Sequence, residues 1–280
     1  MSEFSHLPQS PETPSSHDLK IIKALLGDKV AAKYEGTGGK EISKDGTYVP
    51  SLEELEKVEE ATIESNRETK AEETKRLWMV WANKYDINIE EVKSCAKFQE
   101  NGEVIWEGDC NWDSKGLKEF PPNFVEVKGS FICSANNLIN LSGCPNKIGR
   151  HFNCSDNSII NLEGSPKRII GNFYCNHNKL ISLVGGPLVV RGNFICFANQ
   201  LTSLEGGPIV VEENYDCSNN QLLTLEGCPR LVSATLDCRN NIGIKKMPDR
   251  VEVRGAIKAS KNQIELIADL NAKGYFYYTS

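Results

Sequence analysis

The chain has 280 residues, of which 39% are hydrophobic, and its formal net charge at pH 7 is −6. A chain of this length can form one repeat solenoid with a smaller additional region. The acidic balance lacks the basic bias typical of nucleic-acid binding proteins, so we expect no nucleic-acid partner. The sequence holds no apolar run of about 18 residues, and we expect no membrane span.

The first residues have the composition of an unfolded segment. Residues 1–16 are rich in Ser, Pro and Glu and lack the apolar stretch of a secretory signal peptide. They are predicted to form a disordered or extended tail. This tail is either a floppy end or a tether that becomes ordered on a partner.

Residues 17–95 are predicted to form a helical N-terminal region. Asp18–Leu26 has the apolar spacing of a short amphipathic helix. Ser51 begins a capping box, which predicts a long helix that extends to about Lys84. We expect four large apolar residues near the end of this helix to dock on the first repeat as a cap; an exposed aromatic patch for a partner is the alternative. These residues are Leu77, Trp78, Val80 and Trp81.

A short hairpin is predicted to follow. Residues 96–107 contain Phe98–Trp106, in which an Asn-Gly pair separates two strand-like runs. We expect this hairpin to cover the otherwise open edge of the repeat region, because open sheet edges need protection.

From residue 108 to residue 264 the sequence repeats with a spacing of 21 residues, as from Cys133 to Cys154. Each of the five units from Ser130 to Ala234 carries an aromatic residue, a Cys, an Asn, two aliphatic residues, a Gly and a Pro at fixed offsets. The Cys row is Cys133, Cys154, Cys175, Cys196, Cys217 and Cys238, and the Asn row is Asn136, Asn157, Asn178, Asn199, Asn220, Asn241 and Asn262. Such a period predicts stacked units that bury a core only together.

The Asn row and the Cys row each predict a specific kind of buried side chain. A buried Asn in every unit must satisfy its amide, and we expect it to bond the backbone of neighbouring loops as a ladder. Six of the ten Cys lie in one row, which predicts small buried thiols in a reducing compartment rather than disulfides. We therefore expect a cytoplasmic protein.

The pattern F-x-C-x-x-N-x-L-x-x-L resembles the leucine-rich repeat, with Phe and Cys at two of its Leu positions. The end of each unit, L-x-G-x-P-x-x-V, is similar to short repeats of uncharacterised bacterial and bacteriophage proteins. The resemblance covers roughly residues 108–264. It implies an α+β fold: a leucine-rich-repeat solenoid with a parallel β concave face, an extended polyproline-II-like convex face, an N-terminal helical region and a short C-terminal capping helix.

Residues 265–280 are predicted to form the C-terminal cap. Gln263–Lys273 has the pattern of a short helix with Ile264, Ile267 and Leu270 on one face. The aromatic tail Tyr275–Ser280 is expected to pack on the last repeat, with self-association as the alternative. An oligomer could also form through the N-terminal helices.

We find no sequence motif that would carry catalysis, and we expect a non-enzymatic protein without a cofactor. The run Asp109-x-Asn111-x-Asp113 resembles the beginning of a calcium loop. Ser114 stands where that loop needs Gly, and Phe120 stands where it needs Glu. A solvated turn is the better interpretation, and we expect no metal site.

Function is predicted at the variable outward positions of the concave strands. An apolar-aromatic patch with a charged border is typical of a protein-binding surface; scattered exposed apolar residues without function are the alternative. The patch residues are Tyr174, His177, Ile195 and Phe197, and the border residues are Asp216, Asp237 and Arg239. On the back face, Leu188, Val189, Ile209 and Val210 form a second apolar patch or are buried against one another.

Two functional hypotheses follow. The first is a protein-recognition module that binds a partner protein through the concave face, as the resemblance implies, because leucine-rich repeats mostly bind proteins. The second is a structural or assembly component, for example a phage virion protein docked through its N-terminal arm and helices. The second hypothesis would place the protein in a virion.

Overall fold

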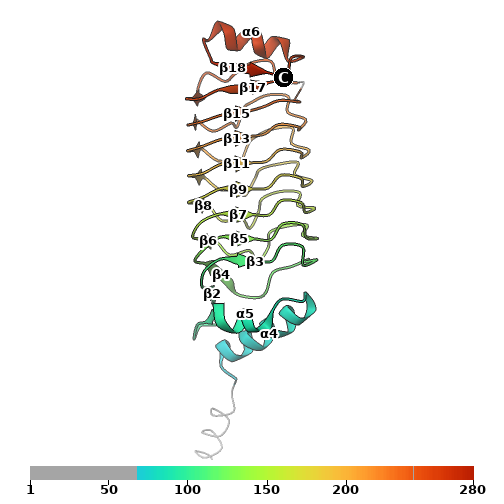
Figure 1. Cartoon of the computed structure of the whole chain (residues 1–280), viewed down its shortest axis with the longest axis vertical. Helices are drawn as coiled ribbons and strands as arrows, with labels where there is room; N and C mark the ends of the chain where they lie inside the picture. The colour runs from blue at the N-terminus through green and yellow to red at the C-terminus, as the bar shows by residue number, and fades with distance from the viewer. Residues whose placement is uncertain (1–67, 242) are drawn as a thin grey trace, which may run out of the picture. The chain divides into compact units, whose positions relative to one another are not determined.

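The computed structural model describes residues 68–241 and 243–280 (Figure 1). The predicted tail 1–16, the predicted helix Asp18–Leu26 and the beginning of the predicted long helix lie outside the described residues. The chain divides into two compact units, Met1–Glu68 and Thr69–Ser280, and every element below belongs to the second.

The second unit is a parallel β-solenoid of about 8 turns with a period of ~21 residues. Its repeat strands form two nine-stranded sheets that run along the stack. Three helices accompany the strands, so the unit is α+β. The repeat pattern therefore predicted the period and the parallel stacking of the strands.

The front sheet contains the strands that carry the aromatic row. Its pairing is in register, with Phe131 opposite Phe152 and Phe173 opposite Phe194. The strands are β3 (Cys110–Asn111), β5 (Phe131–Ile132), β7 (Phe152–Asn153), β9 (Phe173–Tyr174), β11 (Phe194–Ile195), β13 (Tyr215–Asp216), β15 (Leu236–Asp237), β17 (Ile257–Ala259) and β18 (Tyr277–Thr279).

The back sheet contains the strands that carry the β-branched row. Its inward side chains, such as Ile169, Val190 and Val211, are fully buried. The strands are β1 (Ala96–Phe98), β2 (Val104–Trp106), β4 (Phe124–Val127), β6 (Lys147–Ile148), β8 (Arg168–Ile169), β10 (Val189–Val190), β12 (Val210–Val211), β14 (Leu231–Val232) and β16 (Glu252–Val253).

The expected polyproline-II-like convex face is therefore replaced by a second hydrogen-bonded sheet. A polyproline helix leaves its backbone amides to water, whereas here the in-register turns let each amide bond the neighbouring turn. Strands on both sides share the same spacing, about 4.8 Å. Neither side is compressed relative to the other, and the turns stack as a nearly straight column rather than around a concave face (Figure 1).

A column of aromatic rings runs through the core. Phe131, Phe152, Phe173, Phe194 and Tyr215 are fully buried, and successive ring centroids are 5.8, 5.2, 5.3 and 5.3 Å apart. The Cys row lies beside this column, and all six of its thiols are buried. Several of them donate to the backbone carbonyl of the next turn, as Cys133 Sγ does to the oxygen of Asn153 at 3.4 Å.

The Asn row forms the predicted ladder. Asn199 Nδ2 donates to three carbonyl oxygens, those of Cys175, Cys196 and Phe197, at 3.0–3.3 Å. Its Oδ1 accepts from the backbone N–H groups of Asn178 and Leu180. One amide thus bonds two successive turns and satisfies backbone groups where the chain leaves the strand.

The last rung of the ladder differs from the prediction. Asn262 is exposed, and the buried amide is that of Gln263. Its Nε2 donates to the carbonyl oxygens of Cys238 and Asn241, and its Oε1 accepts from the N–H of Ser260. The next residue begins a helix, so the chain direction changes here and the longer side chain reaches the position that Asn occupies elsewhere.

A capped helix and the predicted hairpin cover the first turn. Helix α4 (Lys70–Lys84) begins after Thr69, whose extended backbone and reciprocal capping box with Glu72 exclude one continuous helix from Ser51 to Lys84. Helix α5 (Ile89–Cys95) follows. Strands β1 and β2 then pair as the antiparallel hairpin that the sequence predicted.

Two of the four residues expected to dock are buried. Trp78 and Trp81 lie in the core, and their ring N–H groups donate to the carbonyl oxygens of Pro122 and Glu119. Leu77 and Val80 are 40% and 62% exposed, so their predicted docking is wrong. The helical repeat of 3.6 residues turns these two positions away from the face that holds the tryptophans.

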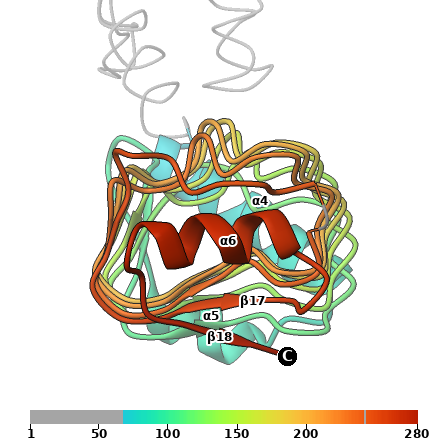
Figure 2. The same cartoon turned by 90° about the horizontal axis from the view of Figure 1, so that it is seen from above.

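The C-terminal cap consists of α6 (Ile264–Ala272) and β18. Helix α6 lies across the end of the solenoid (Figure 2). Leu266 and Leu270 are buried, whereas Ile264 is 73% exposed, which corrects the predicted apolar face. The aromatic tail packs on the last repeat as a strand, because β18 pairs in parallel with β17. None of the helices described between Glu68 and Ser280 is long and apolar enough to cross a membrane.

The ladder amide can be tested at Asn199. We expect Asn199→Ala to lower the free energy of unfolding by about 3 kcal/mol or more, because it leaves several buried backbone groups without partners. Urea unfolding followed by circular dichroism measures this change. Gln200→Ala, at the exposed neighbouring position, should stay within about 0.5 kcal/mol of the wild type. Equal effects of the two substitutions would contradict the structural role of the ladder.

The last ring of the column provides a second test. The Tyr215 hydroxyl is buried beside the Cys196 thiol, and within the described residues it makes no hydrogen bond of ordinary geometry. Tyr215→Phe should therefore raise the free energy of unfolding by about 1 kcal/mol. Tyr275→Phe is the matched control, because its hydroxyl donates to the carbonyl oxygen of Val251 at 2.8 Å, and it should lower stability by a similar amount. A loss of stability in Tyr215→Phe would contradict this assignment.

The buried thiols predict an alkaline limit to stability. Desolvation raises the pKa of the nine buried Cys, that of Cys238 to about 12. The folded-state pKa lies above the unfolded value, so the stabilisation is complete below about pH 8.5 and is lost as pH rises. Nine such thiols give a slope of about −12 kcal/mol per pH unit once the unfolded thiols have ionised.

Urea unfolding between pH 7 and pH 10 in a phosphine reductant measures this slope. A double substitution, Cys175→Ala with Cys196→Ala, should make it shallower by about 3 kcal/mol per pH unit. Cys95→Ala is the matched control, because Cys95 is only half-buried and lies outside the row. A flat profile up to pH 10 would contradict the burial of the row.

Candidate functional site

The outward positions of the front sheet bring four of the predicted site residues into one row. Tyr174 lies on β9, Ile195 on β11, Asp216 on β13 and Asp237 on β15. Each is the direct strand partner of the next, so successive side chains lie about 4.8 Å apart along the stack. Their inward neighbours fill the core, and the strand alternation therefore fixes their outward direction.

His177 and Phe197 lie where the chain leaves the strand. Their rings meet edge to face, with centroids 4.9 Å apart and an interplanar angle of 82°. His177 has a φ of 52°, a left-handed value that recurs at the same position of the neighbouring turns, for example in Ala198 and Asn219. The sequence placed His177 on a strand, but the structure places it at a corner, because a left-handed residue ends the extended run.

The apolar part of the site is held in place by its neighbours. Tyr174, Ile195 and Phe197 are half-buried, and His177 is exposed. The Tyr174 hydroxyl accepts a hydrogen bond of 2.7 Å from Asn172 Nδ2, which fixes the direction of the ring. A partner would thus meet side chains whose rotamers are already restricted, which lowers the entropic cost of binding.

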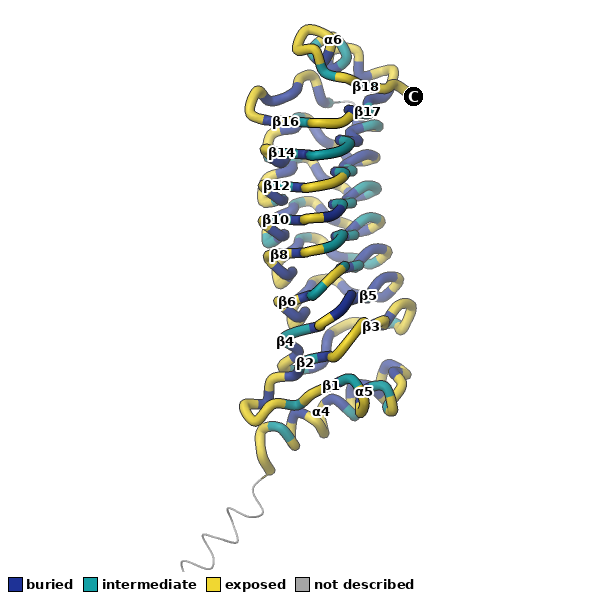
Figure 3. The backbone as a smooth tube through the Cα atoms, turned by 60° about the vertical axis from the view of Figure 1, so that its left-hand side comes forward, coloured by how far each residue is buried: buried dark blue, intermediate teal, exposed yellow. Residues whose placement is uncertain are grey.

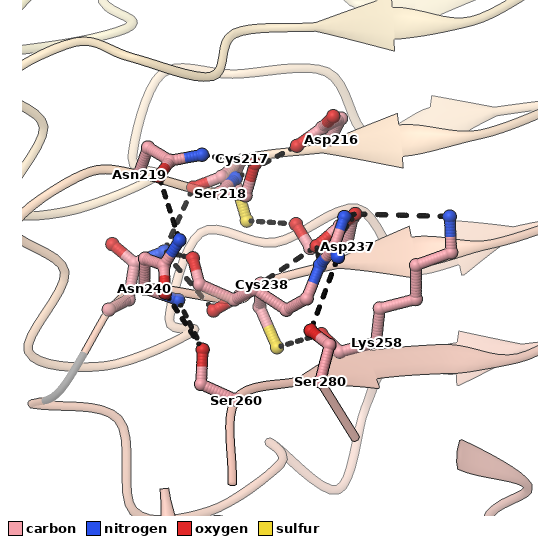
Figure 4. A network of polar contacts seen from close by, with 12 residues as sticks. Asp216, Cys217, Ser218, Asn219, Asp237, Cys238, Asn240, Lys258, Ser260 and Ser280 are labelled. Atoms are coloured by element: carbon pink, nitrogen blue, oxygen red, sulfur yellow. Dashed lines mark hydrogen bonds and ion pairs between the residues drawn. The ribbon is translucent and has the colours of Figure 1, made fainter. Parts of the chain in front are cut away.

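The charged border is largely paired within the chain. Arg239 binds the Asp237 carboxylate with two groups, Nε at 2.9 Å and Nη2 at 2.7 Å. Lys258 Nζ lies 3.9 Å from the same carboxylate (Figure 4), and Arg239 Nη1 donates to Ser280 Oγ. Asp237 is only 6% exposed. These contacts neutralise Asp237 and hold Arg239 against the sheet.

Asp216 differs from Asp237 because it makes no ion pair with any described residue. Burial raises the pKa of its carboxyl above the ordinary value, and the neighbouring Asp237 carboxylate adds to the rise. Hydrogen bonding from Ser218 opposes this rise, and the Ser218 N–H donates to Asp216 Oδ1 at 3.0 Å. The carboxyl can therefore gain from a cationic group that a partner supplies.

A second polar ladder, which the sequence analysis missed, supports the site from one side. The Oδ1 atom of Asn172 accepts from the N–H of Asn193, and that of Asn193 accepts from the N–H of Asn214. The signal was present, because Asn begins three successive repeats. This row orders the backbone just before Tyr174 and Ile195 and includes Asn172, which orients the Tyr174 ring.

Neither the family models nor the curated proteins with which the chain was compared gave a match.

The described residues hold no group of three or more Asp, Glu, His or Cys side chains arranged to bind a metal ion. The acidic run that resembles a calcium loop has other partners. Asp109 Oδ1 accepts from the N–H of Ser130, Asn111 Oδ1 from the N–H of Asp113, and Asp113 Oδ1 from Ser134 Oγ. These side chains bond the loop itself and the next turn rather than converging on one point.

Proposed function

We propose that this protein is a non-enzymatic recognition module that binds a partner protein through the outward face of its front sheet. The observation that carries the proposal is the in-register row Tyr174, Ile195 and Asp216, flanked by the His177–Phe197 ring pair. Pre-ordered aromatic and aliphatic side chains beside a polar border are typical of binding hot spots. We further propose that the repeats are of the leucine-rich type, in the short form of bacterial and bacteriophage proteins.

The Asn ladder and the buried Leu rows support the leucine-rich assignment. The second sheet is a departure from the extended back that the resemblance implies. The free state of all ten Cys suits a reducing compartment, and we propose a cytoplasmic location on that basis.

A second candidate function is an assembly component docked through its N-terminal helices. The observation that favours it is the exposure of Leu77 and Val80 on the outward side of α4. Two neighbouring apolar side chains on a capping helix could dock on another subunit, which would leave the front sheet as a passive surface.

Affinity capture from the native host separates the two functions. Under recognition by the front sheet, Tyr174→Ala with Phe197→Ala should reduce recovery of the specific partner at least about tenfold, because hot-spot side chains each contribute about 1–2 kcal/mol or more. The variant Leu77→Ser with Val80→Ser is the matched control. Loss of partner recovery in that control alone would favour the assembly role. Circular dichroism checks that both variants remain folded.

A further inference from the structure

The back sheet carries an apolar patch on a different side of the solenoid from the proposed site. Ile170, Leu188 and Ile209 are 54%, 53% and 49% exposed, and Val189 and Val210 are half-buried. Figure 3 shows the back strands β8, β10, β12 and β14 stacked one above another, with exposed and intermediate stretches along them. The alternative that these residues are buried against one another is therefore wrong. We call the set of Ile170, Leu188, Val189, Ile209, Val210 and Leu231 the back patch.

The back patch is bounded by cations on adjacent turns. Backbone hydrogen bonds connect Lys167, Leu188, Ile209 and Arg230 in that order. This row therefore has a cation at each end and two exposed aliphatic side chains between them. The parallel row begins with Arg168, which is the strand partner of Val189.

Five cations around the back patch have no charged partner among the described residues. Lys147, Lys167, Arg168, Arg191 and Arg230 make no ion pair with any residue in 68–241 or 243–280. Of the nearby acids, Glu226 and Glu252 are paired with Arg250 and Arg254, whereas Glu212, which follows β12, makes no ion pair with a described residue. The whole chain has a net charge of −6, yet unpaired cations predominate around this apolar centre. Such a surface attracts anionic groups.

We infer that the back patch binds an acidic segment of another protein, with at least two large aliphatic or aromatic side chains between its acidic residues. The aliphatic centre would bury the apolar side chains, and the cations at both ends of the row would pair with flanking carboxylates. Lys167 and Arg230 are three strand spacings apart, about 14 Å. Nucleic acid suits the patch less well, because the space between the cations is aliphatic and offers no ring on which bases could stack.

Selection from a random 16-residue peptide display library, with the full-length chain as bait, tests this inference. Parallel selection uses the variant Leu188→Ser with Ile209→Ser, which changes exposed side chains. Peptides specific to the wild type should be rich in Asp and Glu around two or more large apolar residues. If the two baits select the same peptides, or if the specific peptides are not acidic, the inference is overturned.

One selected peptide is then synthesised, and its affinity is measured by fluorescence anisotropy. Arg168→Glu with Arg230→Glu should weaken binding at least tenfold, and 500 mM salt should weaken it as well. Lys118→Glu with Lys179→Glu changes the net charge equally at positions outside the patch and should leave the affinity within twofold. Tyr174→Ala with Phe197→Ala should also leave it unchanged, so this result does not depend on the front-sheet proposal.

The competing anionic partners are tested with the same variants. The wild-type chain is sedimented with vesicles of 30% phosphatidylserine and is titrated with random-sequence double-stranded DNA. Neither should bind in a way that Leu188→Ser with Ile209→Ser abolishes. If either does, a membrane surface or nucleic acid is the occupant of the back patch and the inference is overturned.

Discussion

The structure depends on a side-chain amide that bonds two turns at once. Where the chain leaves each front strand, its carbonyl and N–H groups cannot all find partners in a sheet. An Asn amide has two N–H donors and two acceptor lone pairs. At Asn199 it makes five hydrogen bonds, because three carbonyl oxygens share the two N–H groups and two backbone N–H groups donate to Oδ1. Because each amide is buried and bonds its own turn and the previous one, it transmits the register of one turn to the next. The strands on either side can then be very short, since the corners as well as the sheets fix the spacing.

A scaffold held in this way separates residues that specify the fold from residues that are free to vary. The inward rows consist mainly of aromatic, Cys, Leu and β-branched residues because each side chain must fit between similar neighbours. The outward rows do not have to fit between core side chains, and their chemistry changes along the stack. On the front sheet it passes from Tyr174 and Ile195 to Asp216 and Asp237, and on the back sheet an aliphatic centre lies between cations. Both surfaces are presented by backbone that has little freedom to rearrange, so a partner would meet side chains already in position.

The sequence predicted the fold to the extent that the fold is periodic. The period, the parallel front strands, the buried Cys row and the Asn ladder all follow from spacing, and so does the alignment of Tyr174 with Ile195. The ends of the solenoid were predicted less well because they are not periodic. Thr69 caps a separate helix although the composition on both sides is helical, and Gln263 replaces Asn262 where the chain turns into α6. At such positions local geometry decides which side chain is buried. At the start of α6 the change in chain direction buries Gln263 and leaves Asn262 exposed.

By itself the sequence determined which residues recur and which vary, because stacking identical units requires identical inward side chains. Three matters depended on the tertiary structure. The back of each unit became a second sheet, since neighbouring turns bring amides and carbonyls within bonding distance. Asp237 proved to be neutralised by Arg239 and Lys258, whereas Asp216 has no such partner. The stacking of turns also places unpaired cations from different repeats around the back patch. Each of these results depends on which side chains of different turns meet in space, and such contacts exist only after the chain has coiled.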